Sequence, residues 1–177
     1  LLFPLEAGTN TLTIENNQVP VMLGKITVSP EIGISTYAQY REQYKDKPAA
    51  GPAVWVTEGE DYAEKSASYI RGEKSNDYNV QPYDPARKQI NYLAPESLTY
   101  VFDIKESGLY HISLKYKQNE KKDLPVFKRV SVDGEVPFQE LRDYAFPYTG
   151  SAYRNETLTA GKEKAWIYLE EGSHTLT

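Results

Sequence analysis

Three pairs of residues lie in stretches that we predict to be loops. The side chains of one pair are an aromatic ring and an amide, those of the second are two amides, and those of the third are two aromatic rings. They are Asn91 with Tyr92, Gln118 with Asn119, and Tyr148 with Tyr153. An aromatic face can cover the C–H surface of a pyranose ring, and an amide can donate to and accept from neighbouring hydroxyls. These residue types could therefore capture a sugar without covalent chemistry. The alternative for each is that it packs against its own loop.

Catalytic chemistry finds little support in the residue types. The two histidines, His111 and His174, have no nucleophile partner in the sequence around them, and no Gly-rich phosphate loop or metal-spaced cluster occurs. We therefore predict that the chain is not an enzyme. A glycosidase needs only two carboxylates, and the chain has 25 acidic residues, so a glycan-cleaving domain stays open as a minor alternative. The glycosylation sequon at Asn155 is a short motif that arises by chance.

Alternation of apolar and polar residues is the main signal for the elements that carry these loops. It predicts strands over 98–104 and 110–116, joined by a turn at 105–108 and placed in one antiparallel sheet. The run 126–132 ends at Asp133-Gly134, which predicts a two-residue hairpin turn with 135–138 folding back on 130–132. Further strands are expected at 165–169 and from 174 onward, and many short strands between turns indicate a sandwich or barrel.

One segment has helical spacing instead. Tyr37, Tyr40 and Tyr44 repeat at three and four residues, and Thr36 with Gln39 forms a capping box, which predicts a short helix within 35–44. Residues 45–52 have the composition of a linker. A second helical turn is expected after Pro137. Trp55 is expected in the core, whereas Trp166 either packs on a sheet face or forms a flat platform.

Composition fits one globular domain. The 177 residues can bury a core, and their net charge of -5 favours neither nucleic acid nor an anionic membrane as a partner. Cysteine is absent, which suits an extracellular protein, and no apolar stretch is long enough for a membrane helix.

An internal echo bears on the domain organisation. Residues 5–13 (LEAGTNTLT) and 169–177 (LEEGSHTLT) are identical at six of nine positions. Two tandem modules would explain this, although Gly at a turn and Thr-Leu-Thr in a strand also recur by chance. We expect 1–34 to hold strands of a preceding module or strands that complete the sandwich, 35–53 a helix and linker, and 54–177 the sandwich itself. A sandwich that stops at Thr177 is expected to leave an open edge, so deletion of 1–28 is predicted to cause aggregation or unfolding.

A family resemblance covers about residues 54–177. The segments GLYHISLK (108–115), DGEVPFQE (133–140), FPY (146–148) and GSHTL (172–176) resemble the galactose-binding-domain-like modules of bacterial extracellular solute-binding lipoproteins, which serve sugar ABC importers and are related to carbohydrate-binding modules. The resemblance implies an all-β fold, a jelly-roll β-sandwich, on the outer face of the cell, attached through the parent protein. Its partners would be an oligosaccharide or polysaccharide and neighbouring domains. The loop at 91–95 is shorter than in these relatives, which puts a binding cleft there in doubt.

The resemblance also implies a structural calcium near the first strand of the sandwich. Glu58 and Glu60 lie where the acidic motif of that family would be, and two carboxylates could supply part of the six to eight oxygens that calcium requires. The alternative is a solvated acidic turn. We therefore predict a non-catalytic carbohydrate-binding module, with a structural spacer that has no ligand of its own as the alternative.

Overall fold

The structure is a computed structural model that describes residues 5–13, 28, 33–52, 55–74, 88–90, 96–120 and 122–177. The chain divides into two compact units, Leu1–Gly33 and Ile34–Thr177, and we call the second unit the body. The described part is mostly strands with one short helix, as predicted for an all-β protein.

Thirteen strands, one α-helix and one 3-10 turn are described. In chain order they are α1 Tyr37–Gln43, β1 Glu64–Lys65, β2 Gly72–Lys74, β3 Lys88–Ile90, β4 Leu98–Ile104, β5 Gly108–Tyr110, β6 Ser113–Tyr116, β7 Val126–Lys128, η1 Gln139–Leu141, β8 Tyr144–Phe146, β9 Arg154–Thr157, β10 Thr159–Ala160, β11 Glu163–Lys164, β12 Ile167–Leu169 and β13 Gly172–Leu176.

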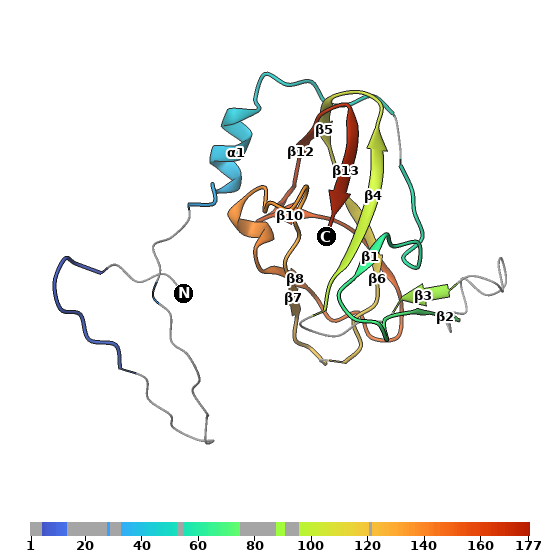
Figure 1. The fold of residues 1–177 in the computed structure, drawn as a ribbon, viewed down its shortest axis with the longest axis horizontal. Coiled ribbons are helices and arrows are strands. Elements are labelled where there is room, and N and C mark those ends of the chain that lie inside the picture. The colour runs from blue at the N-terminus through green and yellow to red at the C-terminus, as the bar shows by residue number, and fades with distance from the viewer. Residues whose placement is uncertain are drawn as a thin grey trace. The chain divides into compact units, whose positions relative to one another are not determined.

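The longest strand, β4, pairs antiparallel with β1 on one side and with β13 on the other (Figure 1). Its inward positions Leu98, Phe102 and Ile104 are buried and Val101 is exposed, as its alternation predicts. The other edge of β13 is covered as well, because Ser131 and Thr177 exchange two backbone hydrogen bonds of 2.8 and 2.9 Å. The open edge expected at the end of the body is therefore paired.

The prediction that 98–104 and 110–116 share one sheet is wrong. β5 pairs with β12 and β6 pairs with β9, whereas β4 belongs with β13. The chain passes from one sheet to another after β4, and it does so again between β12 and β13. The two connections lie against each other, because the Glu171 N–H donates to Ser107 Oγ at 2.8 Å. We call each of these connections between two sheets an arch. Alternation identifies the buried face of a strand but not its partner strand, so it does not distinguish an arch from a hairpin.

The turn predicted at Asp133-Gly134 is present. Both residues have positive φ, at 52° and 80°, and Val132 and Glu135 exchange backbone hydrogen bonds of 2.8 and 3.0 Å. The positive angles are those of a type I′ turn, which matches the twist of the flanking strands. The chain folds back over this one pair only. Phe138 then enters the core, and the helical turn predicted after Pro137 is the 3-10 turn η1.

Helix α1 forms as predicted, with the capping box of Thr36 and Gln39 in place. Its buried residues Tyr37 and Tyr40 lie in the core cluster, and their hydroxyls accept backbone N–H groups of Trp166 and Tyr168 at 2.9 Å. Burial raises the pKa of Tyr40 to about 12. The helix thus satisfies the backbone along one edge of β12, which closes that edge to other strands.

The segment assigned to a linker is partly paired with the body. The Ala50 N–H donates to the Leu109 carbonyl at 3.0 Å, and the Leu109 N–H donates to the Pro48 carbonyl at 2.9 Å. Gly108 makes this approach possible, because a Cβ there would lie 3.0 Å from the backbone of Ala50. The second edge of the β5–β12 pair is covered in this way.

The internal echo is repeated in local geometry. Gly8 and Gly172 hold equivalent positions and have φ of 121° and 139°. Two residues further on, Asn10 Nδ2 donates to the Glu6 carbonyl at 2.9 Å, and His174 Nε2 lies 2.8 Å from the carbonyl of Glu170, again four residues back. The two segments therefore share a turn as well as a sequence.

Candidate functional site

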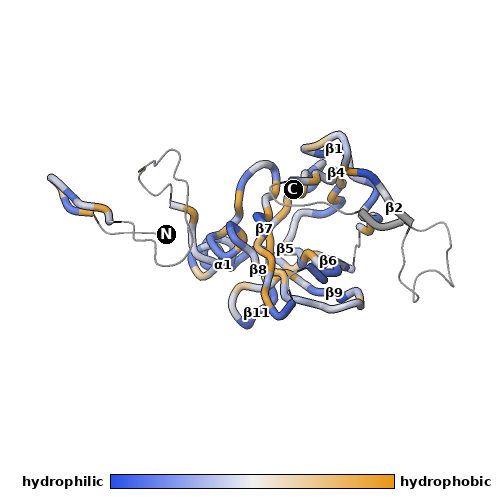
Figure 2. Tube along the Cα trace, turned by 90° about the horizontal axis from the view of Figure 1, so that it is seen from below, coloured by the Kyte–Doolittle hydropathy of each residue, from blue (hydrophilic) through white to orange (hydrophobic). Residues whose placement is uncertain are grey.

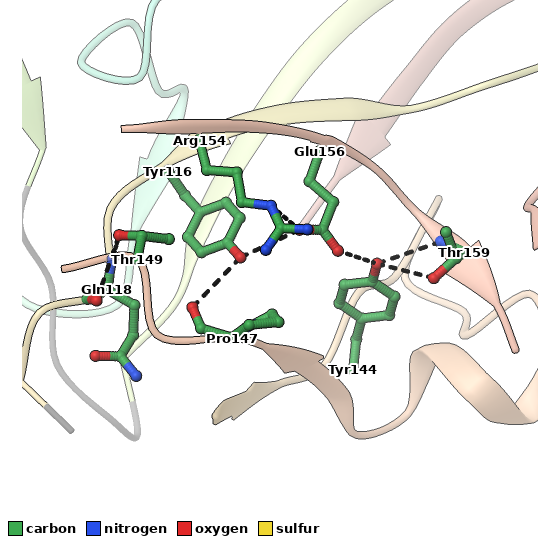
Figure 3. A network of polar contacts seen from close by, with 8 residues as sticks. All are labelled: Tyr116, Gln118, Tyr144, Pro147, Thr149, Arg154, Glu156 and Thr159. Carbon is green, nitrogen blue, oxygen red and sulfur yellow. Dashed lines mark hydrogen bonds and ion pairs between the residues drawn. The ribbon is translucent and has the colours of Figure 1, made fainter. Parts of the chain in front are cut away.

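Two loops that carry predicted sugar contacts are tied to each other. Residues 117–125 join β6 to β7, and residues 147–153 join β8 to β9. The Thr149 N–H donates to the Gln118 carbonyl at 2.9 Å, and the Gln118 N–H donates to Thr149 Oγ1 at 3.0 Å (Figure 3). Four of the six predicted residues, Gln118, Asn119, Tyr148 and Tyr153, belong to these two loops.

The four residues differ in what they offer a ligand. Gln118 is buried, and its Nε2 donates to the Leu124 carbonyl at 2.7 Å, which closes the first loop upon itself. Its amide therefore supports the loop, in line with the packing alternative. Asn119 is exposed, and Tyr148 and Tyr153 are half-buried. These three are the residues through which a ligand could be reached.

A polar network beneath the loops holds them on the sheet (Figure 3). The two oxygens of the Glu156 carboxylate accept hydrogen bonds from the hydroxyls of Tyr116, at 3.2 Å, and Tyr144, at 3.4 Å. Arg154 Nε lies 3.1 Å from the same carboxylate, and the Tyr116 hydroxyl also reaches the Pro147 carbonyl at 3.4 Å. Partial burial, followed by the negative charge of Glu156, raises the pKa of Tyr116 to about 12, so this hydroxyl stays a donor. The network fixes the start of the second loop relative to β6 and β9.

The opposite side of the β6–β9 pair faces outward and is polar. In the register of this pair Ser113 faces Thr157 and Lys115 faces Asn155, and the Ser113 and Thr157 hydroxyls lie 2.8 Å apart. Strand β9 is hydrophilic along its length (Figure 2). This surface adjoins the second loop through Tyr153.

Two lysines gather on the Tyr153 ring at this surface. Lys115 Nζ lies 5.4 Å and Lys117 Nζ 5.1 Å from the ring centroid. Both distances are within the range of a cation–π contact, which is worth about 0.5–1 kcal/mol at an exposed site. The arrangement presents a ring and two positive charges together. We call Lys115, Lys117 and Tyr153 the lysine–tyrosine cluster.

A second aromatic contact lies just before the start of β6. His111 stacks on Trp166 with ring centroids 3.6 Å apart and planes 28° from parallel. His111 Nδ1 lies 2.8 Å from the Ala165 carbonyl, so this nitrogen carries the proton that it donates. Trp166 is half-buried against this partner.

Trp55, predicted for the core, is 41% exposed and contacts Phe102 at 5.1 Å between centroids, because it lies outside the strands that enclose the core cluster.

The remaining predicted residues divide between the described and undescribed parts of the chain. Asn91 and Tyr92 lie outside the described residues. Glu58 and Glu60 are half-buried at a turn whose Gly59 carbonyl accepts the Tyr100 hydroxyl at 2.7 Å. Within the described ranges no group of three acidic or histidine side chains could hold a metal ion. The calcium site stays a prediction.

The lysine–tyrosine cluster was missed at the level of sequence, although a signal for it existed. Residues 113, 115 and 117 alternate in the sequence, the register of β6 with β9 sets 155 and 157 opposite the first two of them, and Tyr153 directly precedes β9. The alternation is visible in the sequence. The register that brings Tyr153 beside the lysines is not.

Comparison with protein-family models finds no match, and no curated protein matches the sequence either. None of the helices in the described part of the chain is long and apolar enough to cross a bilayer.

Proposed function

We propose that the body is a non-catalytic carbohydrate-binding module with a jelly-roll β-sandwich fold. Its parent would be a secreted, cell-surface solute-binding lipoprotein that serves a sugar ABC importer. The fold proposal is supported by the two arches, which place β4 and β13 in one sheet and β5 and β12 in another, with core residues on both. The wider assignment rests on the resemblance of 54–177 to such modules.

One observation carries the binding proposal: the 117–125 and 147–153 loops are bonded to each other and present Asn119, Tyr148 and Tyr153 at one end of the β6–β9 pair. Ligand sites tend to form where loops are positioned by a rigid scaffold. The network around Glu156 supplies that scaffold, so little order has to be gained on binding.

The chemistry would be reversible capture. A tyrosine ring offers a flat apolar surface to the C–H face of a sugar, and the Asn119 amide can both donate to and accept from hydroxyls. Both Glu156 oxygens accept hydrogen bonds from tyrosines inside the network. That use favours a structural role for this carboxylate over one as an acid that would donate a proton.

The proposal is tested by calorimetry of the full chain against xylo-, manno-, galacto- and gluco-oligosaccharides and polygalacturonate. Each titration is run with calcium and with a chelator, which also tests Glu58 and Glu60. We expect saturable binding to at least one glycan and a loss of tenfold or more in Tyr153→Ala. Tyr69→Ala is the matched control, because Tyr69 is 67% exposed on another turn. No binding to any of these glycans by the unaltered chain would instead favour a spacer.

A further inference from the structure

The outward surface of the β6–β9 pair is positively charged, although the chain as a whole carries a net charge of -5. Alternation and register place Ser113, Lys115, Asn155 and Thr157 there, and the ring contacts of the two lysines add Lys117 and Tyr153. Two are lysines and none is acidic. The positive charge of this surface is therefore local and does not follow from the composition.

Neither lysine of the cluster is neutralised by a carboxylate within the described residues. Their contacts there are with the Tyr153 ring, at 5.4 and 5.1 Å. Arg154, the next residue along the chain, behaves differently, because it turns to the other face and pairs with Glu156 at 3.1 Å. The one carboxylate of this strand is thus engaged beneath the sheet and not at the lysines.

Two ammonium groups held over one ring repel each other, and an anion that approaches both would relieve this repulsion. Lysine stems are flexible, so the charged ends can follow an anionic group while the ring stays in place. A ligand that fits the cluster therefore needs a negative charge close to a surface that packs on an aromatic ring. A sugar acid has both features.

We infer that the ligand of this surface is an acidic glycan, in which a uronate carboxylate contacts Lys115 and Lys117 and the sugar ring packs on Tyr153. This inference rests on the proposed function and names the substrate class of the same site.

The test is calorimetry and affinity electrophoresis of the full chain with polygalacturonate and with its fully methyl-esterified form. The ester has the same sugar rings but lacks the negative charge of the carboxylates. We expect the ester to bind at least tenfold more weakly and the affinity for polygalacturonate to fall as salt rises. The double variant Lys115→Gln/Lys117→Gln is expected to lose tenfold or more. The matched control is Lys162→Gln/Lys164→Gln, which removes the same charge from two exposed lysines elsewhere and is expected to bind normally.

Several outcomes would overturn the inference. Equal binding of the ester would show that the carboxylate does not contribute to recognition. An equal loss of affinity in the Lys162→Gln/Lys164→Gln control would show an effect of overall charge. Equal binding of dextran sulfate, dependent on the same two lysines, would show attraction to any polyanion. Tyr153-dependent binding to neutral glycans alone would contradict this inference but agree with the proposed function. No binding to any glycan would contradict both.

Discussion

His174 and Asp133 join the last strand of the body to the type I′ turn beside it. Nδ1 of His174 lies 2.7 Å from Asp133 Oδ2, and Nε2 lies 2.8 Å from the Glu170 carbonyl. Both partners are acceptors, so both ring nitrogens must carry protons for the two bonds to form together. The geometry therefore favours the imidazolium form, although the His174 side chain is only 12% exposed.

The first prediction concerns pH. Burial alone would lower the pKa of His174, but the bonds to Asp133 and to the Glu170 carbonyl outweigh it, and the pKa is raised. Burial alone would raise the pKa of Asp133, but the bonds from His174 and Thr175 outweigh it, and the pKa is lowered. The contribution of the pair should be complete near pH 5 and fall as pH rises through the raised pKa of His174. Asp133 should lose its share only in acid, as pH falls through its lowered pKa.

The size of this effect is modest, because Asp133 is half exposed and screened by water. We expect about 0.5–1 kcal/mol between pH 5 and pH 8.5 in the free energy of unfolding by urea. The measurement is made on the unaltered chain and on His174→Ala, with the variant as the baseline for all other titrating groups. A difference between the two that stays constant over this range would contradict the ion pair.

The second prediction uses the echo within the chain. At the position equivalent to His174, Asn10 makes the same side-chain bond to a carbonyl four residues back. His174→Asn should therefore keep the bond to Glu170 and lose the charge that pairs with Asp133. Its stability at pH 5 is expected between that of the unaltered chain and that of His174→Ala, with the pH dependence gone. A His174→Asn variant no more stable than the alanine variant would show that the turn does not transfer.

These residues also show what sequence can predict here. The Asp133-Gly134 turn and the Thr36–Gln39 cap are local, since each depends on residues within four positions, and both form as predicted. The pairing of β4 with β13 joins residues about seventy positions apart, and nothing in the alternation of either strand selects its partner.

The candidate site divides in the same way. The placement of Tyr148 and Tyr153 in loops follows from turn chemistry, and the structure agrees with it. The burial of Gln118 depends on the bonds that close its loop and tie it to Thr149, which sequence does not reveal. The lysine–tyrosine cluster likewise depends on a register between two strands.

The third prediction concerns the core. Phe138 is fully buried, and its ring lies 4.9 Å from that of Tyr37 and 5.3 Å from that of Tyr40. Phe138→Ala would leave a cavity beneath the helix, and we expect a loss of about 3–5 kcal/mol in the free energy of unfolding. Phe127→Ala is the matched control: Phe127 is 58% exposed, so the same substitution should cost about 0.5 kcal/mol or less. Similar losses in both variants would mean that Phe138 is not central to the packing.

The fourth prediction compares what the two copies of the repeated sequence, residues 5–13 and 169–177, contribute to the stability of the body. Among the described residues, the core cluster consists of residues between Tyr37 and Leu169, and β13 is paired with β4 and with the segment around Ser131. The body thus has a covered terminal strand of its own. We expect deletion of residues 1–33 to leave a soluble chain whose free energy of unfolding changes by about 0.5 kcal/mol or less, in contrast to the aggregation that the sequence alone suggests.

Deletion of residues 172–177 is the comparison, because it removes the second copy of the same short sequence. It takes away β13 and exposes one edge of β4 together with the backbone of residues 131–133. Exposed strand edges favour aggregation, so this chain should be insoluble or unfolded. Size-exclusion chromatography and urea unfolding of the two deletions decide the matter. If loss of residues 1–33 proves as damaging as loss of 172–177, the first segment is needed to complete the body; if it does not, the body folds without that segment.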